Sequence, residues 1–433
     1  MYQNIFGEWI VLNGIIYIND DIFNDELFSL KLFGIDILLK NCLVLQELKC
    51  KTIYIINTTA ANIEDKLNKI TKDKRLKTPV EVYNNNKSIS SAIMLPYNLV
   101  IHYNQMNSAI INIDTTQEIS YIDIIDKDAV SLAKVFLFKE FKSIENINID
   151  EKANKMIKIN AKVRGLIIKN KDSKGVAEQF LLKSVTKTVE DDGVISFYLY
   201  RKAANLLLHP VIKTSISPNM ITLLSLGLGL FAAYLCLNGH YLSFLLSAFF
   251  LILANIVDCL DGYVARLKHL SSRLGQWLDT VSDDIILYFY FLALSVGLCD
   301  YYEYPELKFY IVIGWSTLFL IQKIIVYHYL IFYAKIGDLT KYKWFFNKNE
   351  NDIENNIKED TVHNKKSILN LIFGKMSKFG YYMGKQDLIV FMFFITAVFN
   401  HIIIQYVLIY IGVFISFFLV LYQTIFKYKD IYK

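Results

Sequence analysis

The sequence has few of the residues that mark secreted or disordered chains. Its 433 residues include only five prolines and five cysteines, and no two cysteines have CxxC spacing. This composition excludes a collagen-like chain, a disordered chain and a disulfide-stapled scaffold. We expect the cysteines to be reduced, structural thiols of a cytoplasm-facing protein. The N-terminus has no charged start followed by an apolar stretch and a cleavage site, so no signal peptide is predicted.

A strong excess of charge of one sign is also lacking. The 46 Lys and Arg residues face 41 Asp and Glu residues, which gives a formal net charge of +5. This balance argues against a dedicated nucleic-acid binder. Apolar residues are plentiful instead, because 54% of the chain is hydrophobic and 15% is aromatic. The composition therefore predicts a membrane protein with a soluble part.

The pattern of apolar residues changes near residue 190. In the first part the apolar runs are short, as in Thr52–Ile56 and Ser108–Ile113, and Asn, Asp and Lys interrupt them. Runs of this length fit strands and helices of a soluble domain. Residues Phe33–Ile56 predict a helix followed by a strand. We therefore expect residues 1–190 to form a soluble α/β domain that stays in the cytoplasm.

Long apolar runs begin at Ile216. Most of them approach the ~20 residues that a helix needs to cross a bilayer, and the fifth is shorter. Lys and Arg gather in the connections that follow even-numbered runs, which predicts a cytoplasmic C-terminus. The Lys-rich residues 335–386 are interpreted as a cytoplasmic insertion. The sequence thus predicts six membrane-spanning helices, at residues 218–237, 242–260, 280–298, 309–331, 387–400 and 403–426.

A further helix is expected directly before the first span. Residues Ser196–Lys213 combine apolar side chains with the basic residues Arg201, Lys202 and Lys213. Such a helix is typical of an element that lies along a membrane surface.

Four aspartates at the ends of spans two and three are the most informative residues. Asp258 and Asp261 are three residues apart, and Asp279 and Asp283 are four apart, so each pair shares one face of a helix. Acids are costly in a membrane, and four like charges repel one another. Divalent cations held by carboxylate oxygens are the simplest neutralisers. The neighbouring Asp284 is interpreted as a helix cap or an ion-pair partner.

Nearby residues fit a substrate that carries phosphate. Gly262 and Gly275 remove side chains where two helices, or a helix and a ligand, approach closely. Arg266 offers a planar guanidinium for bidentate pairing with a phosphate. The chain has only five arginines, and Arg266 and Arg273 both lie in this segment. Lys323, within the fourth span, either contacts an anionic acceptor or snorkels to the interface.

The full pattern, D-x2-D-G-x2-A-R-x8-G-x3-D-x3-D, resembles the signature of the CDP-alcohol phosphotransferase family. All eight fixed positions are present: Asp258, Asp261, Gly262, Ala265, Arg266, Gly275, Asp279 and Asp283. The resemblance covers residues 190–433 and implies a six-helix membrane domain over 191–433 and two Mg²⁺ or Mn²⁺ ions.

The resemblance also implies roles for single residues. Asp258, Asp261 and Asp279 would be the main metal ligands, and Asp283 would complete the site and act as general base on the acceptor hydroxyl. Gly262, Arg266 and Gly275 would lie against the nucleotide and its phosphates. Pro218 and Asn219 resemble the Pro-Asn segment that opens the first span in this family and lies near the cytidine, although Ser-Pro is also an ordinary helix start.

The implied reaction moves a substituted phosphate group from a CDP-linked donor to an alcohol or alcohol-phosphate acceptor and releases CMP. The donor would be CDP-diacylglycerol or a CDP-alcohol, and the setting phospholipid synthesis in a lipid bilayer. No nucleic-acid partner is implied, and a homodimer stays open. A membrane transporter or scaffold is the alternative class, but acids of a transport path should lie at the midplane of several spans. These acids cluster at one interface.

The soluble part resembles another family. Residues Phe33–Ile56 are similar to a stretch of sugar-nucleotide nucleotidyltransferases, some of which are fused to CDP-alcohol phosphotransferase domains. Those enzymes hold a triphosphate in a glycine-rich loop with a basic residue. Here the first 40 residues contain no Gly-x-Gly, and no arginine precedes Arg75. Such a loop cannot bring its N–H groups close to phosphates. The resemblance implies a degenerate domain for docking or regulation; the alternative is a bifunctional enzyme that makes its own inositol-phosphate-like CDP-alcohol donor.

Overall fold

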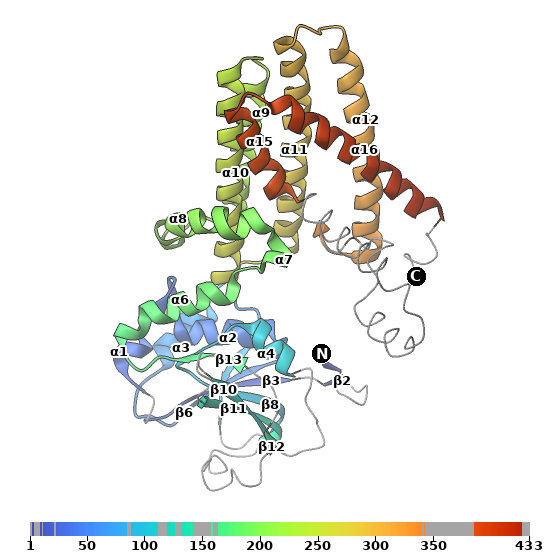
Figure 1. Ribbon diagram of the computed structural model, residues 1–433. Coiled ribbons are helices and arrows are strands. Elements are labelled where there is room, and N and C mark those ends of the chain that lie inside the picture. Colours follow the sequence, from blue (N-terminus) through green and yellow to red (C-terminus); the bar gives the residue numbers. More distant parts are fainter. Residues whose placement is uncertain are drawn as a thin grey trace, which may run out of the picture. The chain divides into compact units, whose positions relative to one another are not determined.

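The chain divides into two units in the computed structural model (Figure 1). One unit comprises Met1–Thr186 with Arg266–His269, and the other comprises Lys187–Ala265 with Leu270–Lys433. The structure describes residues 2–3, 9–10, 12–20, 23–84, 88–110, 119–125, 131–141, 157–158, 163–339, 342 and 385–426.

The first unit is built on a mixed sheet of eight described strands. Their order is β12-β10-β11-β8-β3-β6-β7, and β13 also pairs with β10. Strand β3 pairs in parallel with β6 and β8, whereas β11 pairs antiparallel with both of its neighbours. The strands are β3 (Asn13–Ile18), β6 (Ile53–Asn57), β7 (Val80–Val82), β8 (Ile89–Pro96), β10 (Ile119–Ile125), β11 (Ser131–Phe141), β12 (Ile157–Lys158) and β13 (Val163–Arg164).

The unit also contains the helices α1 (Asp25–Phe28), α2 (Ile37–Glu47), α3 (Glu64–Thr71), α4 (Tyr103–Ile110) and α6 (Lys174–Val185). Helices α2, α3 and α4 add buried side chains to the core of this sheet. Helix α2 begins after Asp36, whose side chain accepts a hydrogen bond from the Leu38 N–H, and residues 37–45 of the helix are buried. The other face of the sheet carries the aromatic rings of Tyr54, Phe136 and Phe138. Burial of apolar side chains on both faces explains the apolar runs in β3, β6 and β8.

The predicted helix and strand within Phe33–Ile56 are confirmed as α2 and β6. A short hairpin, β4 (Lys31–Leu32) with β5 (Ile35–Asp36), precedes them. The predicted run at 108–113 begins within α4, and its residues 111–113 lie outside the described part of the chain.

Residues 266–269 belong to the first unit through a group of polar contacts. The His269 ring bonds to Glu47 Oε1 through Nδ1 at 2.8 Å and lies 3.2 Å from Lys40 Nζ through Nε2. Burial lowers the pKa of Lys40 to about 8. Burial, together with the nearby charges of Lys40 and His269, lowers the pKa of His102 to about 4. The exclusion of water from these groups disfavours their charged forms.

The second unit is helical. It contains α7 (Val189–Asp192), a π-helical turn η4 (Ser196–Tyr200), α8 (Arg201–Lys213), α9 (Pro218–Cys236), α10 (Tyr241–Leu267), α11 (Arg273–Tyr301), α12 (Leu307–Tyr329) with the turn η5 (Leu330–Ala334), α15 (Gln386–Val398) and α16 (Ile402–Phe426). The last two residues of α10, Arg266 and Leu267, are counted with the first unit.

Five of the described helices are long and apolar enough to cross a membrane: α9, α10, α11, α16 and α12 with its extension to Ala334. The chain is thus a multi-pass membrane protein. The predicted number of six spans is not confirmed, because the fifth predicted span corresponds to α15, which has only 13 residues. The predicted insertion at 335–386 lies mostly outside the described residues.

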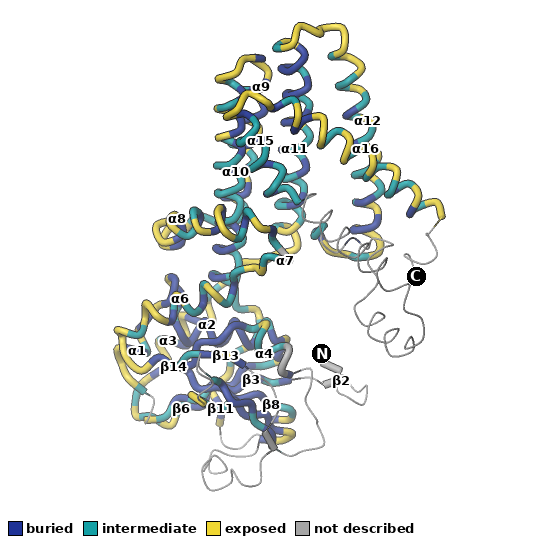
Figure 2. The backbone as a smooth tube through the Cα atoms, in the orientation of Figure 1, coloured by how far each residue is buried: buried dark blue, intermediate teal, exposed yellow. Residues whose placement is uncertain are grey.

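Helix α11 is the most buried of these five helices (Figure 2). It packs closely on α9 because small residues line the contact. A Cβ atom at Gly229 of α9 would lie 2.6 Å from Ile286 Cγ1 of α11, and one at Gly297 of α11 would lie 2.0 Å from the Cys236 carbonyl oxygen of α9. Only glycine permits such distances, so the two glycines set how closely the helices approach.

The helix expected over Ser196–Lys213 is present as η4 and α8. Leu206 and Leu207 are exposed on it, as a membrane-surface helix requires. Arg201 does not share that exposure. It is 4% exposed, its Nη2 donates to Asp192 Oδ1 at 2.8 Å, and its guanidinium lies 5.0 Å from the Tyr263 ring centre. The interpretation of Arg201 as part of the exposed polar face is wrong, because the residue is buried. Its ion pair with Asp192 compensates the cost of that burial.

Candidate active site

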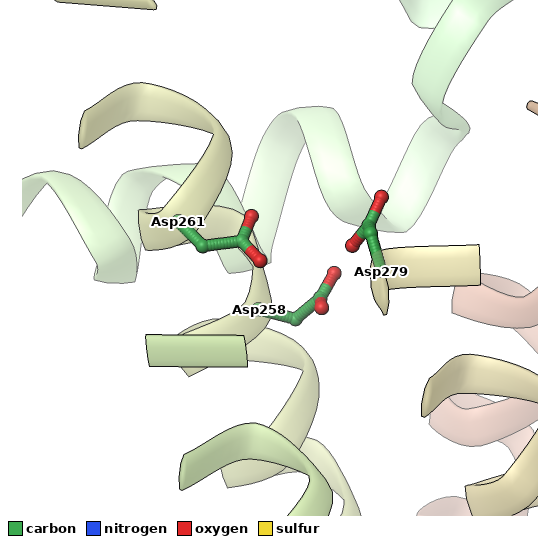
Figure 3. Close-up of side chains that lie close together, drawn as sticks. All are labelled: Asp258, Asp261 and Asp279. Carbon is green, nitrogen blue, oxygen red and sulfur yellow. The ribbon is translucent and has the colours of Figure 1, made fainter. Parts of the chain in front are cut away.

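Three carboxylates meet where α10 and α11 lie side by side. Asp258 and Asp261 project from α10 and Asp279 projects from α11 (Figure 3). One oxygen from each carboxylate lies within 4.8 Å of the others. The three-residue spacing of Asp258 and Asp261 places both acids on one side of α10, near Asp279 of α11. Residues 268–272 separate the two helices, and Ser272 begins α11 by accepting a hydrogen bond from the Gly275 N–H at 3.0 Å.

The chemistry of these donors fits a divalent cation. All three groups offer hard oxygen ligands, and Asp258 and Asp279 are half-buried while Asp261 is only 8% exposed. Like charges this close repel strongly where water is scarce. A Mg²⁺ or Mn²⁺ ion would neutralise them and would accept this ligand set.

Thr222 supports one of the three acids. Its hydroxyl donates to Asp261 Oδ2, and the residue is 2% exposed on the adjoining helix α9. The same hydroxyl also lies 3.2 Å from the Pro218 carbonyl oxygen. A hydrogen bond to a ligand oxygen fixes the orientation of that ligand. Sequence reasoning missed this role, although Thr222 follows Pro218 by four residues and therefore shares its helix face.

The start of α9 lies close to the start of α11. Ser217 caps α9, and Pro218 occupies the first helical turn, where its missing N–H costs nothing. A Cβ atom at Gly275 would lie 3.3 Å from Asn219 Oδ1. The predicted residues Asn219 and Gly275 are therefore neighbours, and the glycine leaves the amide side chain of Asn219 accessible at this point.

Asp283 lies one turn further along α11 and is not part of the three-carboxylate group. Its Oδ1 accepts a hydrogen bond from Gln386 Nε2 of α15 at 3.4 Å. Its role as base and fourth ligand stays a prediction. Asp284 is the buried member of a separate network, as the ion-pair interpretation predicted. It accepts from Lys323 Nζ at 2.5 Å and from the Tyr327 hydroxyl at 2.6 Å.

Lys323 is thereby placed against Asp284 rather than extended along the helix surface. Its side chain is 21% exposed. Neither of its two predicted roles, contact with an acceptor or snorkelling, accounts for this pairing. The ion pair satisfies both charges within the helical unit.

The two remaining predicted residues lie at the end of α10. Gly262 follows Asp261 directly and is half-buried. The Nε of Arg266 donates to the Val185 carbonyl oxygen at 2.9 Å, so part of this guanidinium is used within the first unit. Phosphate binding by Arg266 stays a prediction.

Comparison with known proteins connects the helices around this site with a known family. Residues 215–418 match the family model described as CDP-alcohol phosphatidyltransferase. The chain is 31% identical over 138 residues to a protein named bifunctional IPC transferase and DIPP synthase from Aquifex aeolicus (strain VF5). The aligned residues make up 32% of this chain and 31% of that protein. It is 36% identical over 78 residues to a CDP-diacylglycerol--glycerol-3-phosphate 3-phosphatidyltransferase from the same organism, covering 18% of this chain and 42% of that protein. The chain thus spans less than half the length of these curated relatives. The resemblance stated from the aspartate pattern is confirmed for residues 215–418.

Proposed function

Since residues 215–418 match the CDP-alcohol phosphatidyltransferase family model, we propose that the chain is a membrane transferase. It moves a substituted phosphate group from a CDP-linked donor to an alcohol acceptor and releases CMP, in phospholipid synthesis. The observation that carries the proposal is the group of three motif carboxylates from two helices, with one oxygen of each within 4.8 Å of the others.

Each residue of the site has a task in this reaction. Asp258, Asp261 and Asp279 would hold two Mg²⁺ or Mn²⁺ ions together with Asp283. A bound divalent ion supplies positive charge to the donor diphosphate. Thr222 orients Asp261, and the closely placed Asn219 and Gly275 form the wall against which the nucleotide lies. Gly262 and Arg266 contact the diphosphate.

Asp283 completes the reaction as general base. The acceptor hydroxyl gives its proton to this carboxylate while the new O–P bond forms. The P–O bond to CMP breaks, and CMP leaves with the bonding electron pair. Proton transfer needs the Asp283 carboxylate to be unprotonated and correctly oriented. Asp283 lies one helical turn beyond Asp279, which keeps it near the three carboxylates.

The soluble part is proposed to be a nucleotidyltransferase-like domain over residues 1–190 that docks or regulates, with the membrane domain over 191–433. The Lys and Arg pattern favours a cytoplasmic location for the first domain, the site and the C-terminus. A second candidate function, in which the first domain also makes the CDP-alcohol donor, is supported by the name of the bifunctional relative. The lack of glycine between Asn19 and Asn24, directly after β3, argues against it.

CMP release tests the proposed function. The purified full chain is incubated in vesicles with CDP-diacylglycerol or a CDP-alcohol, a panel of alcohols and alcohol phosphates, and either Mg²⁺, Mn²⁺ or EDTA. We expect CMP to appear only with a matching donor, acceptor and divalent ion. Absence of CMP with every combination would overturn the proposal.

A further inference from the structure

Gln386 is the one described residue outside the aspartate pattern for which the structure gives a hydrogen bond to Asp283. We propose that Gln386 is a positioning residue that orients the Asp283 carboxylate as base. The inference rests on the proposed function and adds to it a residue that the aspartate pattern does not contain.

The contact has a defined direction. Gln386 is the first residue of α15 and is half-buried, and its Nε2 lies 3.4 Å from Asp283 Oδ1. An amide nitrogen can only donate and a carboxylate oxygen accepts, so the interaction holds Oδ1. The second oxygen, Oδ2, is then left to take the proton of an acceptor hydroxyl. Catalytic hydrogen bonds are often this long before substrate is bound and tighten in the complex with substrate.

The residue next to Gln386 anchors the start of α15. Asp387 is 4% exposed, its Oδ2 accepts from the Ser196 N–H at 2.9 Å, and its carbonyl oxygen accepts from the Tyr200 hydroxyl at 3.2 Å. Gly193 makes this contact possible. Its φ is +124°, and a Cβ atom there would overlap the Asp387 carboxylate. The turn that carries Gln386 is therefore tied to the 193–200 segment.

A neutral donor suits this role better than a cation. A lysine or arginine at this place would form an ion pair with Asp283 and weaken it as a base. An amide fixes the direction of the carboxylate while leaving its negative charge available. Misplacement of a catalytic group by about 1 Å can cost about 100-fold in rate, so a single orienting bond can be decisive.

The test measures kcat, KM and the solvent deuterium isotope effect for the purified full chain. Gln386→Leu removes the donor at similar size, and Gln386→Glu removes it at the same shape. We expect kcat to fall about 10- to 100-fold in both, with KM for the CDP-linked donor within about threefold. The isotope effect on kcat should rise, because proton transfer to a poorly oriented base limits turnover more.

Gln322→Leu is the matched control. Gln322 donates from α12 to Ser416 Oγ of α16 at 2.7 Å, so this substitution removes a similar amide from a contact between two other helices. It should leave kcat and the isotope effect unchanged. A kcat within twofold of wild type in both Gln386 variants would overturn the positioning role. The role would also be overturned if the lower kcat came with a larger loss of thermal stability than Gln322→Leu shows. Failure of the wild-type chain to release CMP would instead overturn the proposed function on which the role rests.

Discussion

Single side chains at the ends of α10 and α11 carry most of the chemistry. Three carboxylates with oxygens within 4.8 Å of one another repel, and each is partly removed from water. Such an arrangement is unfavourable unless positive charge joins it. Removing one of the acids should therefore affect ion binding more than it affects folding.

Asp279→Asn is the direct test of this argument. The substitution keeps the shape of the side chain and removes its charge, so CMP release should fall below about a tenth of the wild-type rate while the chain still inserts in the membrane. The rate of CMP release at saturating Mg²⁺ measures the effect. Asp300→Asn provides the control, because Asp300 is an exposed aspartate of the same helix that pairs with Lys308. Equal rates in the two variants would contradict the metal-site interpretation.

Thr222→Val tests the support that Asp261 receives. Valine keeps the volume of threonine and removes the hydroxyl that donates to Asp261 Oδ2. We expect the Mg²⁺ concentration for half-maximal activity to rise about 10-fold, because a ligand without its orienting bond binds more weakly. Thr424→Val in α16 removes a hydroxyl that bonds within its own helix, to Val420, and should leave that concentration unchanged. An unaltered Mg²⁺ requirement in Thr222→Val would rule out the supporting role.

The sequence was sufficient to predict the motif acids but not the residues that support them. Asp258 and Asp261 are three residues apart on α10, and Asp279 follows on the next helix, so these acids can be found from local spacing. The contact of Thr222 with Asp261 joins residues 39 apart, and that of Gln386 with Asp283 joins residues 103 apart. Such pairs depend on which helices become neighbours, and one sequence does not specify this.

Close packing of α9 on α11 is the main feature at the scale of elements. It brings Asn219 of α9 to Gly275 of α11, and it depends on glycines at the contact. On the same helix α9, Thr222 reaches Asp261 of α10. The position of the site is thus set by how near these helices can approach.

Gly229→Ala should disturb this packing. The added Cβ would lie 2.6 to 2.8 Å from three atoms of Ile286, a β-branched residue that cannot turn away freely, so we expect a loss of about 1–3 kcal/mol in stability. Gly227→Ala lies on the same helix with nothing within 4 Å of the added atom. It should be neutral or stabilising by about 1 kcal/mol through helix propensity. Thermal unfolding in detergent compares the two variants, and equal midpoints would show that α9 can shift without cost.

His102 makes the stability of the first unit depend on pH. Its pKa is about 4 in the folded unit and 6.5 when unperturbed. Between pH 6.5 and 4 the unfolded chain binds a proton that the folded unit does not, so the free energy of unfolding falls as the pH falls. Above pH 6.5 the side chain is neutral in both states, and its contribution is complete. The urea midpoint of the first unit, measured by pulse proteolysis of the full chain, should decrease from pH 7.5 to pH 5.

His102→Asn should flatten that decrease. Asparagine does not titrate, and its side-chain oxygen can replace His102 Nδ1 as acceptor for the Asn104 N–H, which lies 3.4 Å away. His209→Asn changes an exposed histidine of α8 and should leave the slope as in wild type. The same slope in His102→Asn and wild type would exclude His102 as the source.

The apolar runs predicted most elements of both units. The expected spans agree within a few residues, at one or both ends, with helices α9, α11, α12 and α16. Strand β6 lies where a strand of the first domain was expected. Helices α10 and α11 extend beyond the predicted runs by about two turns, because the aspartate segments continue the helices although they are polar. Hydrophobicity marks the part of a helix in the membrane and not the whole helix.

The chain as a whole joins a helical unit that holds the four motif aspartates to a first unit whose first 40 residues contain no Gly-x-Gly. If a glycine-rich loop is required to hold a triphosphate, residues 1–190 alone should release no pyrophosphate from CTP with an alcohol phosphate and Mg²⁺. A chain truncated at Asp191 should still release CMP from a supplied CDP-linked donor, because it keeps Asp258, Asp279 and Asn219. Pyrophosphate release by the isolated first domain would make the protein bifunctional. Loss of CMP release on truncation would mean that the membrane unit depends on the first domain.

The shortness of α15 has a consequence for the surrounding lipid. A straight helix of 13 residues rises about 20 Å, whereas the hydrocarbon layer is about 30 Å thick. If α15 crosses the layer, the acyl chains around it must compress, or one end of the helix must lie below the headgroups. The end that carries Gln386 and Asp387 is polar and contacts Asp283. Hydrophobic mismatch at this helix would thus thin the layer beside the carboxylates and let water and lipid headgroups descend to them, so that acyl-chain length becomes a determinant of turnover.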